Sequence, residues 1–190
     1  MIRICLPLAL AVLFAPCPAL AQETSSDTPQ TAADCTAPGG PTDQLVCNTP
    51  ALLALDRQMT ALLAKMGTID AKLVEAQADW FERRSKCATD KHAAACTETA
   101  YRERIAVLQA LTAPPAQGPA PFPCRFETAG ILQIDKGDTL TLVRDGTGRL
   151  QGVAMPREKG SRWYPYLRIV DSPEQLRFVV GNNTSYCERP

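Results

Sequence analysis

Cysteine is the residue type with the greatest capacity for chemistry in this chain of 190 residues. Cysteines serve as reactive thiols, as zinc ligands or as disulfides. Zinc sites prefer close pairs with histidines nearby, whereas successive cysteines here are separated by at least eight residues and His92 is the one histidine. We therefore expect no metal and no cofactor. Beyond Cys5 and Cys17, an even set of six remains, which favours three disulfides formed in an oxidising compartment. These six are Cys35, Cys47, Cys87, Cys96, Cys124 and Cys187.

The first 21 residues have the features of a cleavable signal peptide. Arg3 precedes an apolar run over residues 4–13, and the Ala-Leu-Ala sequence ending at Ala21 suits a signal peptidase. We predict cleavage after Ala21 and a periplasmic or secreted protein. The apolar run is shorter than the roughly 20 residues of a membrane span, so no span is expected. Pro16, directly before Cys17, disfavours lipidation of that cysteine.

Charge and composition exclude several classes of function. Twenty basic and twenty acidic residues balance each other, which argues against a nucleic-acid partner. An apolar share of 45% excludes wholesale disorder. The sequence places no nucleophile beside a base and no spaced carboxylate pair on rigid elements. We therefore predict that the protein is not an enzyme.

Two segments of low apolar content divide the chain. Residues 22–33 are rich in Thr, Ser, Gln and Pro and are predicted to be a disordered tether. Residues 113–123 contain five prolines and predict an extended linker. The divisions predict a helical domain at 34–112 and a small β-domain at 124–190, and we expect the two to fold independently.

The first domain shows helical periodicity. Pro50 suits the first turn of a helix capped by Thr49, and Gly67 suits its end. A second helix is predicted from Thr68 to Arg84 or Cys87, with Leu73, Ala76 and Trp80 on its apolar side, and a third from about Ala93. Residues 42–47 are expected to form a short preliminary turn. The apolar residues that define the first helix are Leu52, Leu55, Met59, Leu62 and Met66.

The second domain shows short alternating segments separated by turn residues. Strands are predicted at 125–134, 139–142, 150–155, 161–170 and 176–180, and Pro165 marks the fourth as an edge or bent strand. A Cys124–Cys187 disulfide would close this domain. The predicted fold class is α+β: a disulfide-stapled antiparallel helical hairpin or three-helix domain, followed by a small antiparallel β-barrel or meander.

The spacing of four cysteines bears on their pairing in the helical domain. Cys47 and Cys87 each lie 20 residues from Gly67, so an antiparallel hairpin would place them at the same height. This geometry favours the nested pairs Cys47–Cys87 and Cys35–Cys96. The crossed pairing and the local pairs 35–47 and 87–96 remain open alternatives.

A combined motif in this half resembles a known family. Over residues 34–111 the pattern is similar to the N-terminal domain of the LprI-type lysozyme-inhibitor family. The resemblance implies a secreted, periplasmic or lipid-anchored bacterial protein that inhibits lysozyme. Thr60 and Leu63 stand where the family often has Asn and Tyr, a difference that bears on packing. The matching pieces are Asp34-Cys35, the run from Leu45 to Pro50, Leu55-Asp56-Arg57, Gln77-x-x-Trp80-x-x-x-Arg84-x-x-Cys87, Ala95-Cys96 and Tyr101-Arg102-x-Arg104-Ile105.

The matched residues have predicted structural roles. Trp80 lies on an apolar stripe and is expected in the core. Asp56 and Arg84 are expected to form a solvated or partly buried ion pair, and the charged run at 82–84 is interpreted as a solvated helix face. The other matched polar residues are expected to orient helices through hydrogen bonds; they are Gln77, Tyr101 and Arg104.

The second half resembles, more faintly, the membrane-bound inhibitors of c-type lysozyme. Cys124, a strand around Leu140, a loop at 159–164 and Cys187 occur in the same order as in those proteins. Gly160 suits a tight turn in that loop. The alternative is an unrelated β-module whose loop only packs at a sheet edge. The predicted partner-binding residues, of which the first three are expected to be exposed, are Lys159, Ser161, Arg162 and Tyr164.

The predicted function is a secreted periplasmic binding protein that inhibits lysozyme by blocking its cleft. The alternative is a structural or adaptor protein of the cell envelope without lysozyme contact. Residues 34–112 hold 9 basic and 10 acidic side chains, and residues 124–190 hold 10 basic and 8 acidic ones. Animal lysozymes are cationic, so a basic β-domain gains nothing from long-range steering toward them, whereas it would suit an anionic envelope polymer.

Overall fold

The computed structural model describes residues 32–113, 123–126, 130–137, 139–172 and 175–188. For residues 123–126, 130–131 and 188 it describes the backbone alone. The predicted signal peptide lies outside the described residues. The same holds for the tether except residues 32–33, and for the linker except residues 113 and 123.

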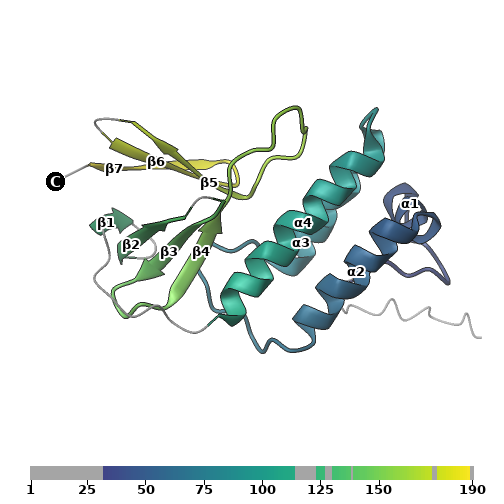
Figure 1. The fold of residues 1–190 in the computed structure, drawn as a ribbon, viewed down its shortest axis with the longest axis horizontal. Coiled ribbons are helices and arrows are strands. Elements are labelled where there is room, and N and C mark those ends of the chain that lie inside the picture. Colours follow the sequence, from purple (N-terminus) through teal and green to yellow (C-terminus); the bar gives the residue numbers. More distant parts are fainter. Residues whose placement is uncertain (1–31, 114–122, 127–129, 138, 173–174, 189–190) are drawn as a thin grey trace, which may run out of the picture.

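Among the described residues of the first half, the structure has four α-helices and one 3₁₀ turn (Figure 1). A full helix replaces the expected turn before Pro50, and α2 begins at Pro50 as predicted. The expected helix from Thr68 begins only at Gln77. No helix among the described residues has the length and apolar character of a membrane span. The elements are α1 (Pro41–Asn48), α2 (Pro50–Leu63), α3 (Gln77–Ser85), η1 (Lys86–Thr89) and α4 (Ala93–Thr112).

Residues 64–76 form a loop, because some of their backbone N–H groups form hydrogen bonds with the β half and not within a helix. The Leu73 N–H donates to the Gln151 carbonyl at 2.9 Å, and the Lys72 N–H donates to Gln151 Oε1 at 3.1 Å. Buried backbone donors need partners, and here they find them across the interface. Leu73, 2% exposed, belongs to the core of the β half.

The helical core lies between α2, α3 and α4. Trp80, which is 1% exposed, packs edge-on against Tyr101 with ring centroids 5.4 Å apart. Trp163 from the second half joins this core. The other buried side chains of this core are contributed mainly by α2 and α4 and include Leu52, Met59, Ala100, Ile105 and Leu108.

The disulfides of the helical half are local, so the nested pairing is wrong. Cys35 pairs with Cys47, and Cys87 pairs with Cys96, each with Cα atoms 5.5 Å apart. The nested pairing assumed a continuous hairpin about Gly67. The chain instead forms a separate helix α1 and a loop at 64–76. Cys47 and Cys87 therefore do not lie opposite each other on one hairpin.

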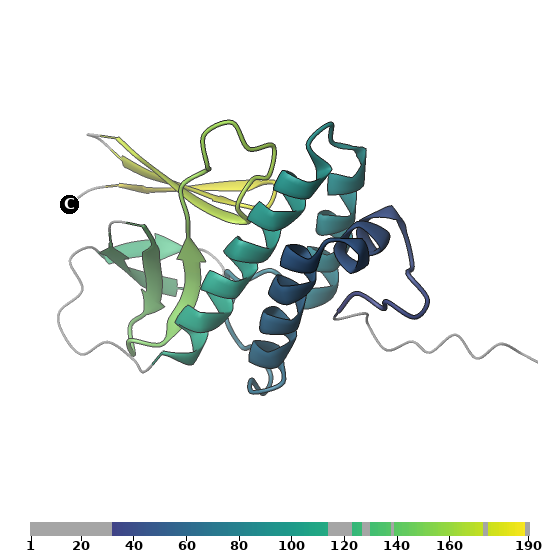
Figure 2. The same ribbon diagram turned by 45° about the vertical axis from the view of Figure 1, so that its right-hand side comes forward.

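In the described part of the second half, seven strands form two consecutive antiparallel meanders (Figures 1 and 2). The predicted α+β class is confirmed, and the sheets form meanders without closing into a barrel. The fourth predicted strand begins only after Pro165. The first sheet comprises β1 (Pro123–Phe126), β2 (Gly130–Lys136), β3 (Thr141–Asp145) and β4 (Leu150–Ala154). The second comprises β5 (Leu167–Asp171), β6 (Gln175–Val180) and β7 (Asn183–Glu188).

Apolar side chains of both sheets form the β core. Cys187 is 5% exposed and disulfide-bonded. The side chain of its predicted partner, Cys124, lies outside the described residues. The buried members of this core include Leu132, Ile134, Val143, Leu167, Leu176 and Phe178.

The two halves share a buried interface, which argues against independent folding. A Cβ on Gly152 of β4 would lie 2.8 Å from the Leu73 Cβ, so only glycine permits this approach. Val107 of α4 packs with Leu150 and Val153 of β4. Each half therefore buries apolar surface of the other. The predicted domain boundaries near residues 112 and 124 stay a prediction.

Candidate partner-binding site

The connection between β4 and β5, residues 155–166, extends from the sheets to the helical half beside α4 (Figure 1). This 155–166 loop turns at Gly160, whose φ of 83° is left-handed, and the Ser161 N–H donates to the Glu158 carbonyl at 3.1 Å. Thr99 Oγ1 of α4 donates to Glu158 Oε2 at 3.0 Å. The predicted tight turn is therefore present and touches α4.

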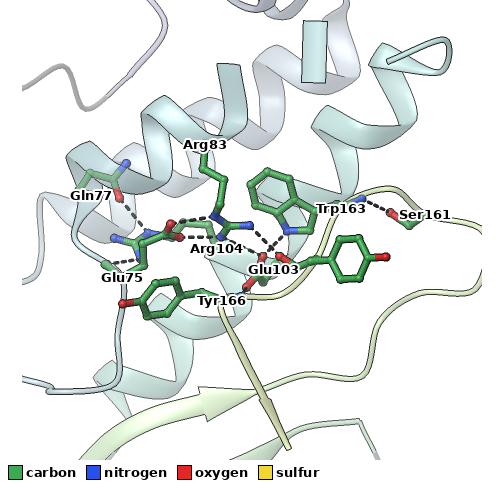
Figure 3. A network of polar contacts seen from close by, with 9 residues as sticks. Glu75, Gln77, Arg83, Glu103, Arg104, Ser161, Trp163 and Tyr166 are labelled. Atoms are coloured by element: carbon green, nitrogen blue, oxygen red, sulfur yellow. Dashed lines mark hydrogen bonds and ion pairs between the residues drawn. The ribbon is translucent and has the colours of Figure 1, made fainter. Parts of the chain in front are cut away.

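Trp163 anchors the loop in the helical half. Its side chain is 4% exposed, and its indole N–H donates to Glu103 Oε2 (Figure 3). The other carboxylate oxygen, Glu103 Oε1, accepts from the Tyr166 N–H at 2.9 Å. The Arg83 guanidinium lies 3.8 Å from the centroid of the Trp163 ring. One α4 carboxylate thus fixes the loop at two points.

Further charged groups support this anchor, as Figure 3 shows. Arg83 donates to both carboxylate oxygens of Glu75, from Nε at 2.8 Å and from Nη2 at 2.6 Å. Arg104 donates to Gln77 Oε1 at 2.8 Å and to the Glu75 carbonyl at 2.9 Å. Bidentate pairs of this kind give geometric specificity as well as energy. We call Glu75, Arg83, Glu103, Arg104 and Trp163 the clasp.

Burial sets the electrostatics of the clasp. Burial raises the pKa of Glu103, an effect that the Arg83 charge and the two donated hydrogen bonds oppose. Burial lowers the pKa of Arg104 to about 10, against the favourable charges of Glu75 and Glu103. Charges removed from water need partners. Within the clasp, the carboxylates of Glu75 and Glu103 lie beside the guanidinium of Arg83.

A second buried polar chain connects the helices behind the clasp. Arg84, fully buried, donates to Asp43 of α1 and, at 2.5 Å, to the Tyr101 hydroxyl. The Tyr101 hydroxyl donates to Asp56 Oδ1 of α2 at 2.8 Å, and burial raises the pKa of Tyr101. Asp56 and Arg84 are therefore connected through Tyr101. This chain ties α1, α2, α3 and α4 together.

The predicted partner-binding residues lie together on the loop but differ in exposure. Lys159 and Arg162 are exposed, and Arg162 Nε lies 3.6 Å from Asp90 Oδ2. Tyr164 is 47% exposed. Ser161 is half-buried, and its hydroxyl accepts from the Trp163 N–H at 3.1 Å. The expectation that Ser161 is freely exposed is therefore wrong, because it positions the anchor.

Two grooves border the exposed side of the loop, with Arg162 lining both. One of about 200 Å³ runs between His92 and Thr99 of the helical half and the turn at Gly160. The other, of about 240 Å³, lies between Lys86 and Tyr164. No cluster of metal-ligating side chains occurs among the described residues. The arrangement suits binding through a protruding cationic and aromatic surface.

Only one member of the clasp was expected to make its contacts: Arg104, predicted to orient helices through hydrogen bonds, donates to Gln77 and Glu75. Arg83 and Arg84 were expected on a solvated helix face, yet the Arg84 side chain is 1% and that of Arg83 25% exposed. Glu103 and Val107 lie four residues apart on α4 and contact the β half. These two residues form a second stripe on α4, beside the apolar stripe that faces the helical core. That second stripe was the available signal of a contact with the β half.

Comparison with known proteins identifies curated mycobacterial relatives. The chain is similar to "Lipoprotein LprI" of Mycobacterium tuberculosis (strains H37Rv and CDC 1551) and of Mycobacterium bovis, with 33% identity over 100 residues in each case. The match covers 52% of this chain and 50% of the relative, so the chain spans about half the length of the curated relatives it matches. No protein-family model matches the chain, and no solved structure matches it significantly. An LprI-like relationship is confirmed for this segment.

Proposed function

We propose that this protein is a secreted binding protein of the bacterial envelope that inhibits lysozyme by placing the 155–166 loop in the enzyme's cleft. The LprI-like segment and the predicted resemblance to LprI-type inhibitors support this function. The observation that carries it is the anchored loop, because Trp163 and Glu103 hold a protruding, cationic segment on a disulfide-stapled base.

Rigidity is the property that a blocking segment needs. Immobilising a flexible side chain on binding costs about 0.5–1.5 kcal/mol. The clasp already fixes the loop at Trp163 and Tyr166, and Arg83 Nη1 donates to the Tyr164 carbonyl at 2.7 Å. The loop therefore enters a cleft with much of this ordering cost already met by folding.

The exposed groups match the chemistry of a glycosidase cleft. Such enzymes place a pair of carboxyl groups around the bond that they cleave. Lys159 and Arg162 can approach those carboxylates, and the exposed ring of Tyr164 offers apolar contact. Because cationic lysozymes would repel a basic surface at long range, the attraction has to arise locally, inside the cleft.

A double substitution tests the contact. Lys159→Ala together with Arg162→Ala should raise the inhibition constant against a c-type lysozyme more than tenfold, about 1.4 kcal/mol. Ser161 stays unchanged because its hydroxyl holds the Trp163 backbone. Thermal unfolding should be nearly unaltered, since both replaced side chains are exposed.

The matched control removes two exposed positive charges, one from α2 and one from the turn that follows it, through Arg57→Ala and Lys65→Ala. That variant should inhibit as the parent does. If the loop variant also inhibits as the parent does, the contact lies elsewhere on the molecule. Absence of inhibition by the parent at micromolar concentration would instead favour the envelope adaptor without lysozyme contact.

A further inference from the structure

The three-stranded sheet has an outer face that points away from the β core. Along β6, Leu176 and Phe178 are buried, so Arg177 and Val179 between them point outward. The pairing register extends this face into two rows across the strands. The rows are Val170–Arg177–Tyr186 and Arg168–Val179–Thr184. We call these six residues the outer face.

The outer face combines exposed apolar side chains with arginine. Val170 is 43% exposed and Tyr186 is 56% exposed. Arg177 lies between them in the same row and is also exposed. The row spans roughly 10 Å, because neighbouring strands lie about 4.8 Å apart. A short stretch of an extended polymer could lie along it.

The outer face is continuous with the exposed ring of Tyr164. The Arg168 guanidinium lies 5.1 Å from the centroid of that ring, and the Arg157 guanidinium lies 3.9 Å from it. A guanidinium stacked on an aromatic face can still donate from its edge. The edge of Arg157 already donates to the Ser161 carbonyl from Nε and Nη2, so Arg168 is the stacked arginine that remains for an anion. Tyr164 and Tyr186 thus bound a strip that holds arginines between two exposed rings.

The arginines of the outer face lack carboxylate partners among the side chains that the structure describes. Asp171 at the end of β5 pairs with Lys136 of β2. None of the ion pairs of the described residues involves Arg168 or Arg177. The buried Nε of Arg168 also has no hydrogen-bond acceptor among the residues that the structure describes. The face therefore keeps positive charge that an external anion would neutralise.

We propose that the outer face binds a carboxylate-bearing glycan chain. Guanidinium forks match carboxylates in bidentate geometry, and exposed tyrosine rings offer flat apolar faces to sugar rings. Arginine and tyrosine are also enriched in protein interfaces, so an acidic polypeptide is the competing occupant, and poly-glutamate serves as the comparison that decides between the two. The proposal is independent of lysozyme inhibition.

Polygalacturonate, a linear carboxylated polysaccharide, is a direct probe. The full chain should bind it in isothermal titration calorimetry at low ionic strength, and added salt should weaken the binding. The double variant Arg177→Gln and Tyr186→Ala should bind at least fivefold more weakly, and Arg177→Gln alone should show part of that loss. Both side chains are exposed, so circular dichroism and melting temperature should match the parent.

Three comparisons separate the sources of binding. Lys159→Ala with Arg162→Ala should leave polygalacturonate affinity within twofold of the parent, which distinguishes this face from the loop. Uncharged dextran and poly-glutamate should each bind at least tenfold more weakly than polygalacturonate. Equal binding of poly-glutamate would assign the face to acidic polypeptides and overturn the proposal. Undiminished binding by the Arg177/Tyr186 variant, or no binding at millimolar uronate, would also overturn it.

Discussion

Replacing Trp163 with alanine is expected to lower the free energy of unfolding by about 3–5 kcal/mol. The side chain is 4% exposed and completes the core of the helical half, although it belongs to the loop of the β half. Its removal leaves a cavity and deprives the buried Glu103 carboxylate of the indole donor. Urea unfolding followed by circular dichroism measures this loss.

Tyr164→Ala is the matched control for Trp163. The two aromatic residues are adjacent in the chain, but Tyr164 is 47% exposed. Its replacement should change the free energy of unfolding by no more than about 0.5 kcal/mol. A Trp163→Ala variant that loses less than about 1 kcal/mol would mean that the loop is not anchored in the helical core.

Arg84→Ala is expected to destabilise the protein by a similar amount, about 3–5 kcal/mol, because it breaks a buried ion pair from one side. Asp43 would stay buried without the guanidinium, and the Tyr101 hydroxyl would lose its donor. The loss should appear in the same urea titration as a lower midpoint with an unchanged slope.

Arg102 of α4 provides the comparison for Arg84. Its side chain is 68% exposed and pairs with Glu98 one turn earlier. Exposed pairs of this kind contribute at most about 0.5 kcal/mol, so Arg102→Ala should be nearly neutral. Equal effects of the two substitutions would show that the chain through Tyr101 does not hold the helices together.

Local patterns predicted the elements whose partners lie nearby in the chain. The spacing of Leu52 and Met59 identified α2, and α4 begins at Ala93 as expected. The loop at 64–76 could not be predicted in this way. Its residues suit a helix, but hydrogen bonds from Lys72 and Leu73 to Gln151, far along the chain, determine its conformation.

The local disulfides and β7 illustrate two further limits. Equal spacing about Gly67 supported the nested pairing only while a single hairpin was assumed, and tertiary contacts removed that hairpin. The last strand (Asn183–Glu188) was missed, although Gly181-Asn182 is a two-residue hairpin signal. Its polar side chains gave no apolar alternation that would have identified a strand.

The candidate site was predictable in part. The turn at Gly160 and the exposed Lys159 and Arg162 follow from the loop's composition. The clasp does not, since Arg83 and Glu103 have the character of surface residues until the β half covers them. The spacing of Glu103 and Val107 on α4 was the one signal of this packing, and a charged residue in such a stripe is ordinarily assigned to the solvent.

Inhibition by blocking requires the 155–166 loop to occupy the lysozyme cleft. Competition with chitotriose, a trisaccharide that occupies such clefts, tests it most directly in a titration of c-type lysozyme with this protein. With chitotriose at about nine times its own dissociation constant, the apparent dissociation constant of the complex should rise about tenfold, as exclusive binding requires. An apparent dissociation constant that chitotriose leaves unchanged would place the protein outside the cleft and contradict inhibition by blocking.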